Sequence, residues 1–431
     1  MPRSALDSPF RLLGLLDSPL RHPGQGYRLV AEVRAAQYVQ AAQATPIVEP
    51  VGAAERAVGP GSDTGTAAAV RAHGHALRHF RFGLIALGVL AALSACFGTL
   101  GLVRHLQKPV VRRVVMNGTT LTAMGATGNV LWTTELDSPW TERFQGEDDS
   151  TWRTQIVDMH GDGAPEVLVA APTAPDEDQL LCFSPRGRVL WCYRAPVQVR
   201  FGMWDVNGPW RLRQMLVAPE NGSRSIYLVV THPVWWPSFV VRISPSGASK
   251  VVFASSGNIR ALGEFHMASG NYILAAGVNN EYAQASLAIL RQGGPPATSP
   301  QSDAVSYLCT RGCPPERPYR YYRYILFPRS ELSTASGTPY NFVAIHGRAN
   351  GVTVGTDEQA VGMMAYYDFS PDLQPERVSY GDGYREVHRQ FEKEGRIKHS
   401  YEQCPERRAP AILRICNENG NWRTVSVPRA P

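Results

Sequence analysis

A short pattern that recurs through the second half of the chain constrains its fold more than any other feature. The copies occupy residues 124–132, 183–191, 243–253 and 369–373, with a weaker copy at residues 287–294. The first two read MGATGNVLW and FSPRGRVLW and start 59 positions apart, and the third starts 60 positions after the second. Each places Pro or Gly between apolar runs, as tight turns between strands require. The chain is therefore expected to repeat one β-rich unit.

These repeats predict a mainly β protein built from stacked small sheets. A second apolar strand recurs in phase with the turns, at residues 166–172, 215–219 and 273–277. A lone small sheet cannot bury both of its faces, whereas stacked sheets can, so this spacing is typical of β-propeller blades. Residues 104–431 leave room for about 5–7 blades. We expect residues 113–116 to pair with residues 423–427 and close the ring; an open array of β-sandwiches is the alternative.

Two of these segments are similar to known propeller repeats. Residues 121–132 resemble quinoprotein-like repeats, and residues 156–169 (IVDMHGDGAPEVLV) resemble the FG-GAP/VCBS repeat, whose loop binds calcium. That resemblance implies one Ca²⁺ held by Asp158, Asp162 and Glu166. Gly163 would allow the sharp bend, but His160 stands where that family has Asp or Asn, and imidazole suits calcium poorly. Otherwise the two aspartates cap a turn.

One uncharged apolar stretch predicts a transmembrane helix. Residues 82–103 contain no charged side chain and are flanked by basic residues on both sides. A helix of this length spans about 33 Å, enough for a hydrocarbon core of about 30 Å. A buried core helix is the alternative. The mean hydropathy of −0.21 excludes a polytopic membrane protein.

Cysteine positions favour an orientation for this span, because the flanking basic residues are nearly balanced. Six cysteines follow the span in three sequence-local pairs: Cys182 and Cys192, Cys309 and Cys313, Cys404 and Cys416. Even numbers of paired cysteines are expected of disulfides in an oxidising compartment; six unpaired, mostly buried thiols are the alternative. We expect the N-terminus inside a bacterial-type cytoplasmic membrane and the C-terminal domain outside, in the periplasmic or extracytoplasmic space.

The N-terminal segment is similar to part of a DNA-binding domain. Residues 22–33 (HPGQGYRLVAEV) resemble the wing hairpin of response-regulator winged-helix domains, as in membrane-tethered ToxR-type regulators. The resemblance covers residues 1–34 and implies a DNA contact by Arg28. The recognition helix that reads the major groove is missing or nearly so, with residues 3–7 as its possible tail, and nucleic acid is an expected partner only if the winged helix is complete upstream. A chance match in a disordered tail is the alternative. Residues 35–81, rich in Ala, Pro and Gly, are predicted to be a flexible linker.

Two segments are candidate binding surfaces. Arg320 and Tyr322 lie in a run that alternates arginine with tyrosine, and Trp235 and Trp236 follow His232. Such side chains are typical of binding sites; an edge strand with solvated arginines and ordinary packing between blades are the alternatives. Near the end, Tyr384, Val387 and Phe391 fall at helical spacing and Gly395 follows as a C-cap, which predicts a helix packed on the propeller.

No catalytic motif occurs in a usable context. Function is therefore expected to be binding: a single-pass membrane protein presenting an extracytoplasmic propeller to a ligand or protein, derived from a one-component signalling regulator. A quinoprotein-type oxidoreductase is the runner-up, although the adjacent cysteines often found in that family are absent from this sequence. An envelope scaffold is a third possibility. The net charge of +6 does not by itself argue for nucleic acid.

Overall fold

The computed structural model describes residues 109–139, 151–174, 177–196, 198–234, 237–301, 307–315, 323–337, 342–358 and 363–430. All of these belong to the second of two compact units into which the chain divides, Leu106–Pro431. The predicted winged-helix remnant, linker and membrane span, residues 1–34, 35–81 and 82–103, lie outside the described residues. Within the described ranges, no helix is long and apolar enough to cross a bilayer.

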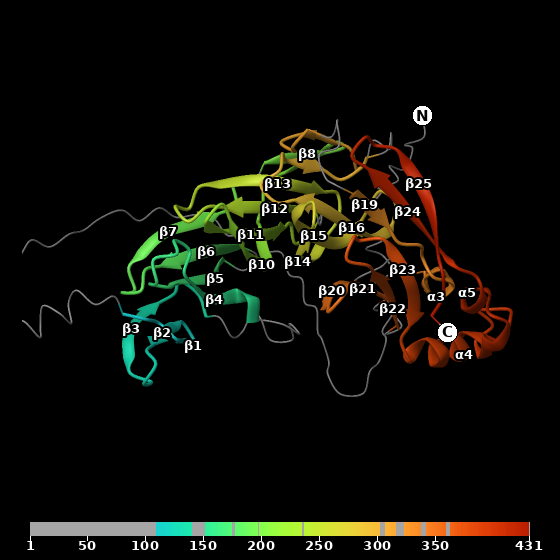
Figure 1. The fold of residues 1–431 in the computed structure, drawn as a ribbon, viewed down its shortest axis with the longest axis horizontal. Helices are drawn as coiled ribbons and strands as arrows, with labels where there is room; N and C mark the ends of the chain where they lie inside the picture. The colour runs from blue at the N-terminus through green and yellow to red at the C-terminus, as the bar shows by residue number, and fades with distance from the viewer. Residues whose placement is uncertain are drawn as a thin grey trace, which may run out of the picture. The chain divides into compact units, whose positions relative to one another are not determined.

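The described part of this unit is mainly β, which confirms the predicted fold class at that level. Three of its sheets are antiparallel meanders in chain order (Figure 1). Sheet A comprises β1 (Arg113–Asn117), β2 (Thr120–Met124) and β3 (Val130–Glu135). Sheet B comprises β4 (Thr154–Val157), β5 (Glu166–Ala174), β6 (Glu177–Phe183) and β7 (Val189–Arg194), preceded by the short helix η2 (Thr151–Arg153). Sheet F comprises β20 (Phe342–Arg348), β21 (Gly351–Glu358), β22 (Met363–Phe369) and β23 (Pro375–Tyr380).

The other sheets combine a meander with strands from elsewhere in the sequence. Sheet D comprises β10 (Arg211–Glu220), β11 (Ser223–Thr231), β12 (Ser238–Ile243), β13 (Ser249–Ser255) and the parallel strand β17 (Ala297–Thr298). Sheet E comprises β14 (Ile259–Met267), β15 (Gly270–Asn279), β16 (Gln284–Arg291), β19 (Arg323–Leu326), β24 (Ala411–Asn417) and β25 (Trp422–Val427). The small sheet C pairs β8 (Val199–Phe201) with both β9 (Trp204–Val206) and β18 (Cys309–Arg311).

Four hydrophobic cores lie between sheets that follow one another along the chain: A with B, B with D, D with E, and E with F. Sheet B shows why the strand after residue 166 is apolar at every position. Val167 and Val169 of β5 face sheet A, whereas Leu168 and Ala170 face sheet D, because successive side chains point to opposite faces. Each fully buried Val or Leu contributes about 1.5–3 kcal/mol relative to exposure.

The predicted repeat is one five-residue turn. It occupies residues 125–129, 184–188, 244–248 and 370–374, and a fifth copy lies at residues 417–421. In every copy the N–H of the first residue donates to the carbonyl of the fifth, and the N–H of the fourth donates to the carbonyl of the first. The fourth residue has a positive φ in all five, between 52° and 85°, which explains why it is glycine in four of them. Residues 291–294, in the predicted weaker copy, form a different turn.

In each of the first two turn-bearing hairpins, a tryptophan contacts and hydrogen-bonds the turn of the next sheet. Trp132 of sheet A donates its Nε1–H to the Pro185 carbonyl in the turn of sheet B, at 3.1 Å, and its ring lies against Gly187. One period later, Trp191 of sheet B donates to the Pro245 carbonyl of sheet D at 2.9 Å and lies against Gly247. A Cβ on either glycine would lie 2.7 Å from the indole ring, so the close approach requires glycine.

The predicted closure between the first and last strands is wrong. β1 pairs only with β2 and β25 only with β24 among the described residues, so neither sheet closes a ring. The C-terminal strands instead extend sheet E, where β24 pairs with β19. In sheet E, β19 lies between β16 and β24, and Leu413 and Ile415 of β24 complete the core against sheet F.

A helical segment lies between sheet F and β24. It contains α4 (Gly383–Lys393), η4 (Tyr401–Gln403) and α5 (Pro405–Arg408), and α3 (Glu331–Ser336) belongs to the same small core. The predicted helix is confirmed: Tyr384 and Phe391 are buried on one face of α4. Gly395, with φ of 69°, donates its N–H to the Glu392 carbonyl just after the helix.

Candidate functional site

The predicted calcium loop is closed by its own carboxylate. Asp158 Oδ1 accepts hydrogen bonds from the backbone N–H groups of Gly161 and Asp162 at 2.7 and 3.1 Å, and Oδ2 accepts from Gly163 at 2.7 Å. These bonds, the one from Gly163 above all, hold the pKa of the Asp158 carboxyl below its usual value. Gly163 has a φ of 78° and so makes the bend that the sequence predicted.

The other two predicted ligands are also engaged within the loop. Asp162 Oδ1 accepts from the N–H of Ala164 at 3.0 Å. Glu166 Oε2 accepts from the N–H of Met159 at 3.0 Å, and its Oε1 lies 2.9 Å from Nδ1 of His160. In the described part of the chain, the three carboxylates are not among the groups whose ligand atoms gather closely enough to share an ion. The residues fit the turn-capping alternative and do not fit a preformed calcium cage.

One of the three cysteine pairs forms a disulfide, Cys309–Cys313, at the end of β18. The other four form no disulfide in the described part of the chain, so the expected disulfides between Cys182 and Cys192 and between Cys404 and Cys416 are wrong. In sheet B, Cys182 stands opposite Trp191 and the neighbouring pair is Leu181 with Cys192, so the two thiols point to opposite faces. Cys404 and Cys416 are separated in the same way, since they are buried in different cores.

The predicted contact residues Arg28, Trp235, Trp236, Arg320 and Tyr322 lie outside the described residues. Their neighbour His232 is described and is buried. Its ring makes an edge contact with Trp210, its Nε2 lies 3.2 Å from the Gly208 carbonyl, and its Nδ1 accepts from the N–H of Val234 at 3.2 Å. His232 therefore packs as a core residue.

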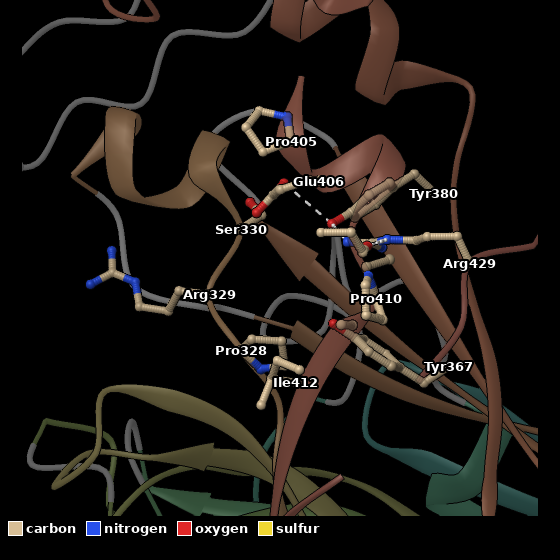
Figure 2. A pocket seen from close by; sticks show the side chains of 13 residues that line it. Pro328, Arg329, Ser330, Tyr367, Tyr380, Pro405, Glu406, Pro410, Ile412 and Arg429 are labelled. Carbon is tan, nitrogen blue, oxygen red and sulfur yellow. Dashed lines mark hydrogen bonds between the residues drawn. The ribbon is translucent and has the colours of Figure 1, made fainter. Parts of the chain in front are cut away.

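A cavity of about 240 Å³ opens where α3, sheet F, α5 and β24 converge. Figure 2 shows the side chains around it. Its lining is mixed, with prolines and tyrosines beside polar and charged groups: Pro328, Arg329, Ser330, Ala365, Tyr367, Tyr380, Pro405, Glu406, Ala409, Pro410, Ala411, Ile412 and Arg429. Arg329 points away from Tyr380 and Arg429 in this view, and its guanidinium bonds to Ser333 of α3. Arg429 is therefore the cationic group directed at this cavity.

Arg429 is held by three contacts. Its Nε donates to the Ala409 carbonyl at 3.0 Å, its Nη2 donates to the Tyr380 hydroxyl at 3.0 Å, and the guanidinium lies 4.5 Å from the centre of the Tyr380 ring. Tyr380 in turn donates to Glu406 Oε2 at 3.2 Å. Nη1 of Arg429 is buried and has no hydrogen-bond partner among the described residues. The guanidinium of Arg429, oriented by these contacts, therefore belongs to a residue that lines the cavity.

Four potential metal ligands lie close to this cavity, since Glu406 lines the cavity and also accepts a hydrogen bond from one of them, Glu331. Glu331 comes from the first turn of α3, His388 from α4, His399 from the loop after α4, and Cys404 from the residue before α5. The two histidine Nε2 atoms are 3.3 Å apart, His399 Nε2 is 3.2 Å from Glu331 Oε2, and Cys404 Sγ is 3.9 Å from that oxygen. All four ligand atoms lie within 4.8 Å of one another.

Burial and a second layer of hydrogen bonds hold these ligands in place. His388 and Cys404 are fully buried, and burial lowers the pKa of the His388 imidazole, which favours its neutral form. The Tyr384 hydroxyl lies 3.1 Å from Cys404 Sγ and donates to Glu406 Oε2 at 2.9 Å. Glu406 Oε1 accepts from the N–H of Glu331 at 2.7 Å. Burial raises the pKa of the Glu406 carboxyl, although these donors oppose the shift.

Sequence reasoning missed both the cavity and this cluster. The predicted helix was expected only to pack, and Cys404 was assigned to a disulfide. The available signal was the series His388, His399 and Cys404 within 17 residues of a polar helical segment. Glu331 is 57 positions upstream of His388, and no spacing in the sequence indicates that the two meet.

Comparisons with known proteins add little to this geometry. No family model matches the chain, and no curated protein matches it. Among solved structures, a chain described as "Structure of Dos1 propeller" is similar over 74% of this chain and 76% of that one, with 9% sequence identity and a TM-score of 0.29. The mainly β architecture therefore rests on the sheets and cores described above.

Proposed function

We propose that this chain is a single-pass membrane protein whose residues 104–431 form a propeller-like stack of sheets outside the membrane and bind a small anionic ligand there. The uncharged stretch at residues 82–103 supports the span. The stacking of sheets A, B, D, E and F in chain order supports the propeller-like arrangement. The Cys309–Cys313 disulfide supports an oxidising compartment.

The observation that carries the binding proposal is Arg429. Its side chain is an oriented guanidinium at the wall of a cavity, and a carboxylate or phosphate oxygen is the best partner for such a cation. Tyr380 and Glu406 fix the guanidinium on one side, so little side-chain freedom is lost when an anion binds. The Tyr367 and proline walls suit an anion attached to a small apolar group.

The experiment compares two arginine variants of the purified protein. Benzoate and inorganic phosphate are titrated, and binding is followed by isothermal calorimetry. Arg429→Gln removes the cation at the cavity, whereas Arg423→Gln removes an exposed arginine of β25 in the same part of the sequence. We expect Arg429→Gln to weaken binding at least about tenfold, since a hydrogen bond to a charged group contributes roughly 1.5–3 kcal/mol. Arg423→Gln should bind as the wild type does.

Two results would contradict the proposal: equal affinities in the two variants, or no binding of either anion by the wild type. Circular dichroism of Arg429→Gln shows whether the sheets remain folded. A quinone absorbance spectrum in the purified protein would instead favour the quinoprotein-type oxidoreductase, the runner-up. If neither a ligand nor a quinone binds, the envelope scaffold becomes the better proposal.

Descent from a winged-helix regulator is a separate part of the proposal, supported only by the resemblance of residues 1–34. Arg28 would contact DNA only if a recognition helix is encoded in frame upstream. Sequencing the genomic DNA before the first codon tests this part without affecting the binding proposal.

A further inference from the structure

We propose that Glu331, His388, His399 and Cys404 are the four ligands of a structural zinc ion. Each contributes one atom to a common centre: a carboxylate oxygen, two imidazole nitrogens and a sulfur. A tetrahedral zinc ion with bonds of about 2.0 to 2.3 Å holds its ligand atoms about 3.3 to 3.6 Å apart. The distances of 3.2, 3.3 and 3.9 Å within the cluster are close to these values.

The chemistry of the four donors selects the metal. Calcium and magnesium take oxygen ligands, so a set with two imidazoles and a thiol excludes both. Zinc accepts nitrogen, sulfur and carboxylate ligands in a tetrahedron without a preference imposed by its d electrons. Four protein ligands leave no open position for water, and two of them, His388 and Cys404, are fully buried. The site is therefore structural and not catalytic.

The hydrogen bonds around Cys404 and Glu331 match those of a metal site, whereas Nδ1 of His388 is buried without a hydrogen-bond partner among the described residues. Tyr384 lies against the Cys404 sulfur, and Glu406 accepts from both the Tyr384 hydroxyl and the Glu331 N–H. Such contacts orient ligands and are typical of the layer surrounding bound metals. Zinc binding would release the Cys404 thiol proton to solvent and form a sulfur–zinc bond in its place.

The helical segment also has the smallest hydrophobic core among the described residues, so a cross-link would stabilise it. Its core is small, with five buried side chains: Leu332, Tyr384, Phe391, Ile397 and Cys404. Small cores of this kind often depend on a metal or a disulfide. An ion bound to Glu331 and to the three later ligands would fasten α3 to the segment that contains α4 and α5.

Metal content of the full-length purified protein tests the proposal. We expect one zinc per chain by elemental mass spectrometry in the wild type, and less than a tenth of that in His399→Ala and Cys404→Ser. The controls are His266→Ala and Cys192→Ser, which change an exposed histidine and an exposed cysteine elsewhere and should retain zinc. Wild-type protein that takes up no stoichiometric zinc would overturn the proposal, and so would equal zinc in Cys404→Ser.

A second measurement separates metal binding from misfolding. Cobalt exchanged into the site should give the absorption of a tetrahedral ion with a sulfur-to-metal charge-transfer band. That band should disappear in Cys404→Ser, while circular dichroism shows that the β-sheets remain. A chelator should lower the Tm of the wild type by several degrees and leave that of His399→Ala unchanged. The calorimetric titrations with benzoate and phosphate test the anion site at Arg429 separately. Either proposal can therefore be contradicted without affecting the other.

Discussion

The Asp158 carboxylate holds three backbone N–H groups of its own loop, and its charge therefore contributes to the local stability. The order of glycines and acids around residue 163 correctly predicted a sharp bend. It did not identify the partner of the carboxylates, because a cation and a set of backbone N–H groups favour the same residues. Only the positions of the N–H groups separate the two.

Replacing Asp158 by asparagine should show how much the carboxylate charge contributes to the stability of the fold. The pKa of Asp158 is depressed in the folded state, so its stabilisation is present above the unfolded pKa of about 3.9 and is lost as pH falls through the folded value. We expect Asp158→Asn to lower the urea midpoint at pH 7. Below about pH 4, the midpoint of the variant should approach that of the wild type. Asp372→Asn, at an exposed position in another turn, is the control. A pH-independent difference, or a rise in Tm on adding calcium, would contradict this assignment.

Hairpins are the elements in which sequence and structure agree best. The Ser-Pro-x-Gly pattern predicts a turn because each of its residues satisfies a local requirement: Ser184 Oγ, for example, accepts from the N–H of Arg188, and Gly187 supplies the positive φ. The fifth copy, at residues 417–421, escaped prediction because Asn417 replaces serine. Its Oδ1 accepts from the N–H groups of Asn419 and Asn421, so a different side chain makes equivalent bonds.

Two glycines in the same turn position separate backbone strain from packing. Gly128 and Gly187 have φ values of 78° and 80°, but only Gly187 lies against Trp132. Alanine at Gly128 should cost about 1–2 kcal/mol through the positive φ alone. Alanine at Gly187 should cost a further 1–3 kcal/mol or so, because its Cβ would displace the indole ring. Urea unfolding of both variants measures the difference, and equal losses would show that the contact with Trp132 is unimportant.

For the whole molecule, local patterns predicted the class and stacking of sheets but not which strands complete them. β19 and β24 are neighbours in sheet E although sheet F and the helical segment separate them in sequence. Unpaired strand edges offer similar N–H and C=O groups to any partner, so an apolar pattern cannot choose between them. The same limit hid the metal cluster, since it depends on α3 meeting the segment that follows sheet F.

The orientation of the whole molecule is tested by two fusions at the C-terminus. Alkaline phosphatase needs an oxidising compartment to become active, so we expect an active fusion if residues 104–431 lie outside the membrane. A β-galactosidase fusion at the same position should be inactive. The reverse pattern, in cells where immunoblots show equal expression, would contradict both the orientation and the compartment inferred from the Cys309–Cys313 disulfide.

The contact between a tryptophan and the turn of the next sheet also affects how such a chain can gain further sheets. Gly187 receives the indole of the preceding sheet, and Trp191, four residues later in the same hairpin, reaches the following one. The hairpin of sheet B thus carries both halves of the joint. A duplication of one period would add a unit already complementary to its own copy on both sides. Gain or loss of this unit would preserve the joint between its neighbours, so the number of sheets can change among descendants while the joint is inherited unchanged.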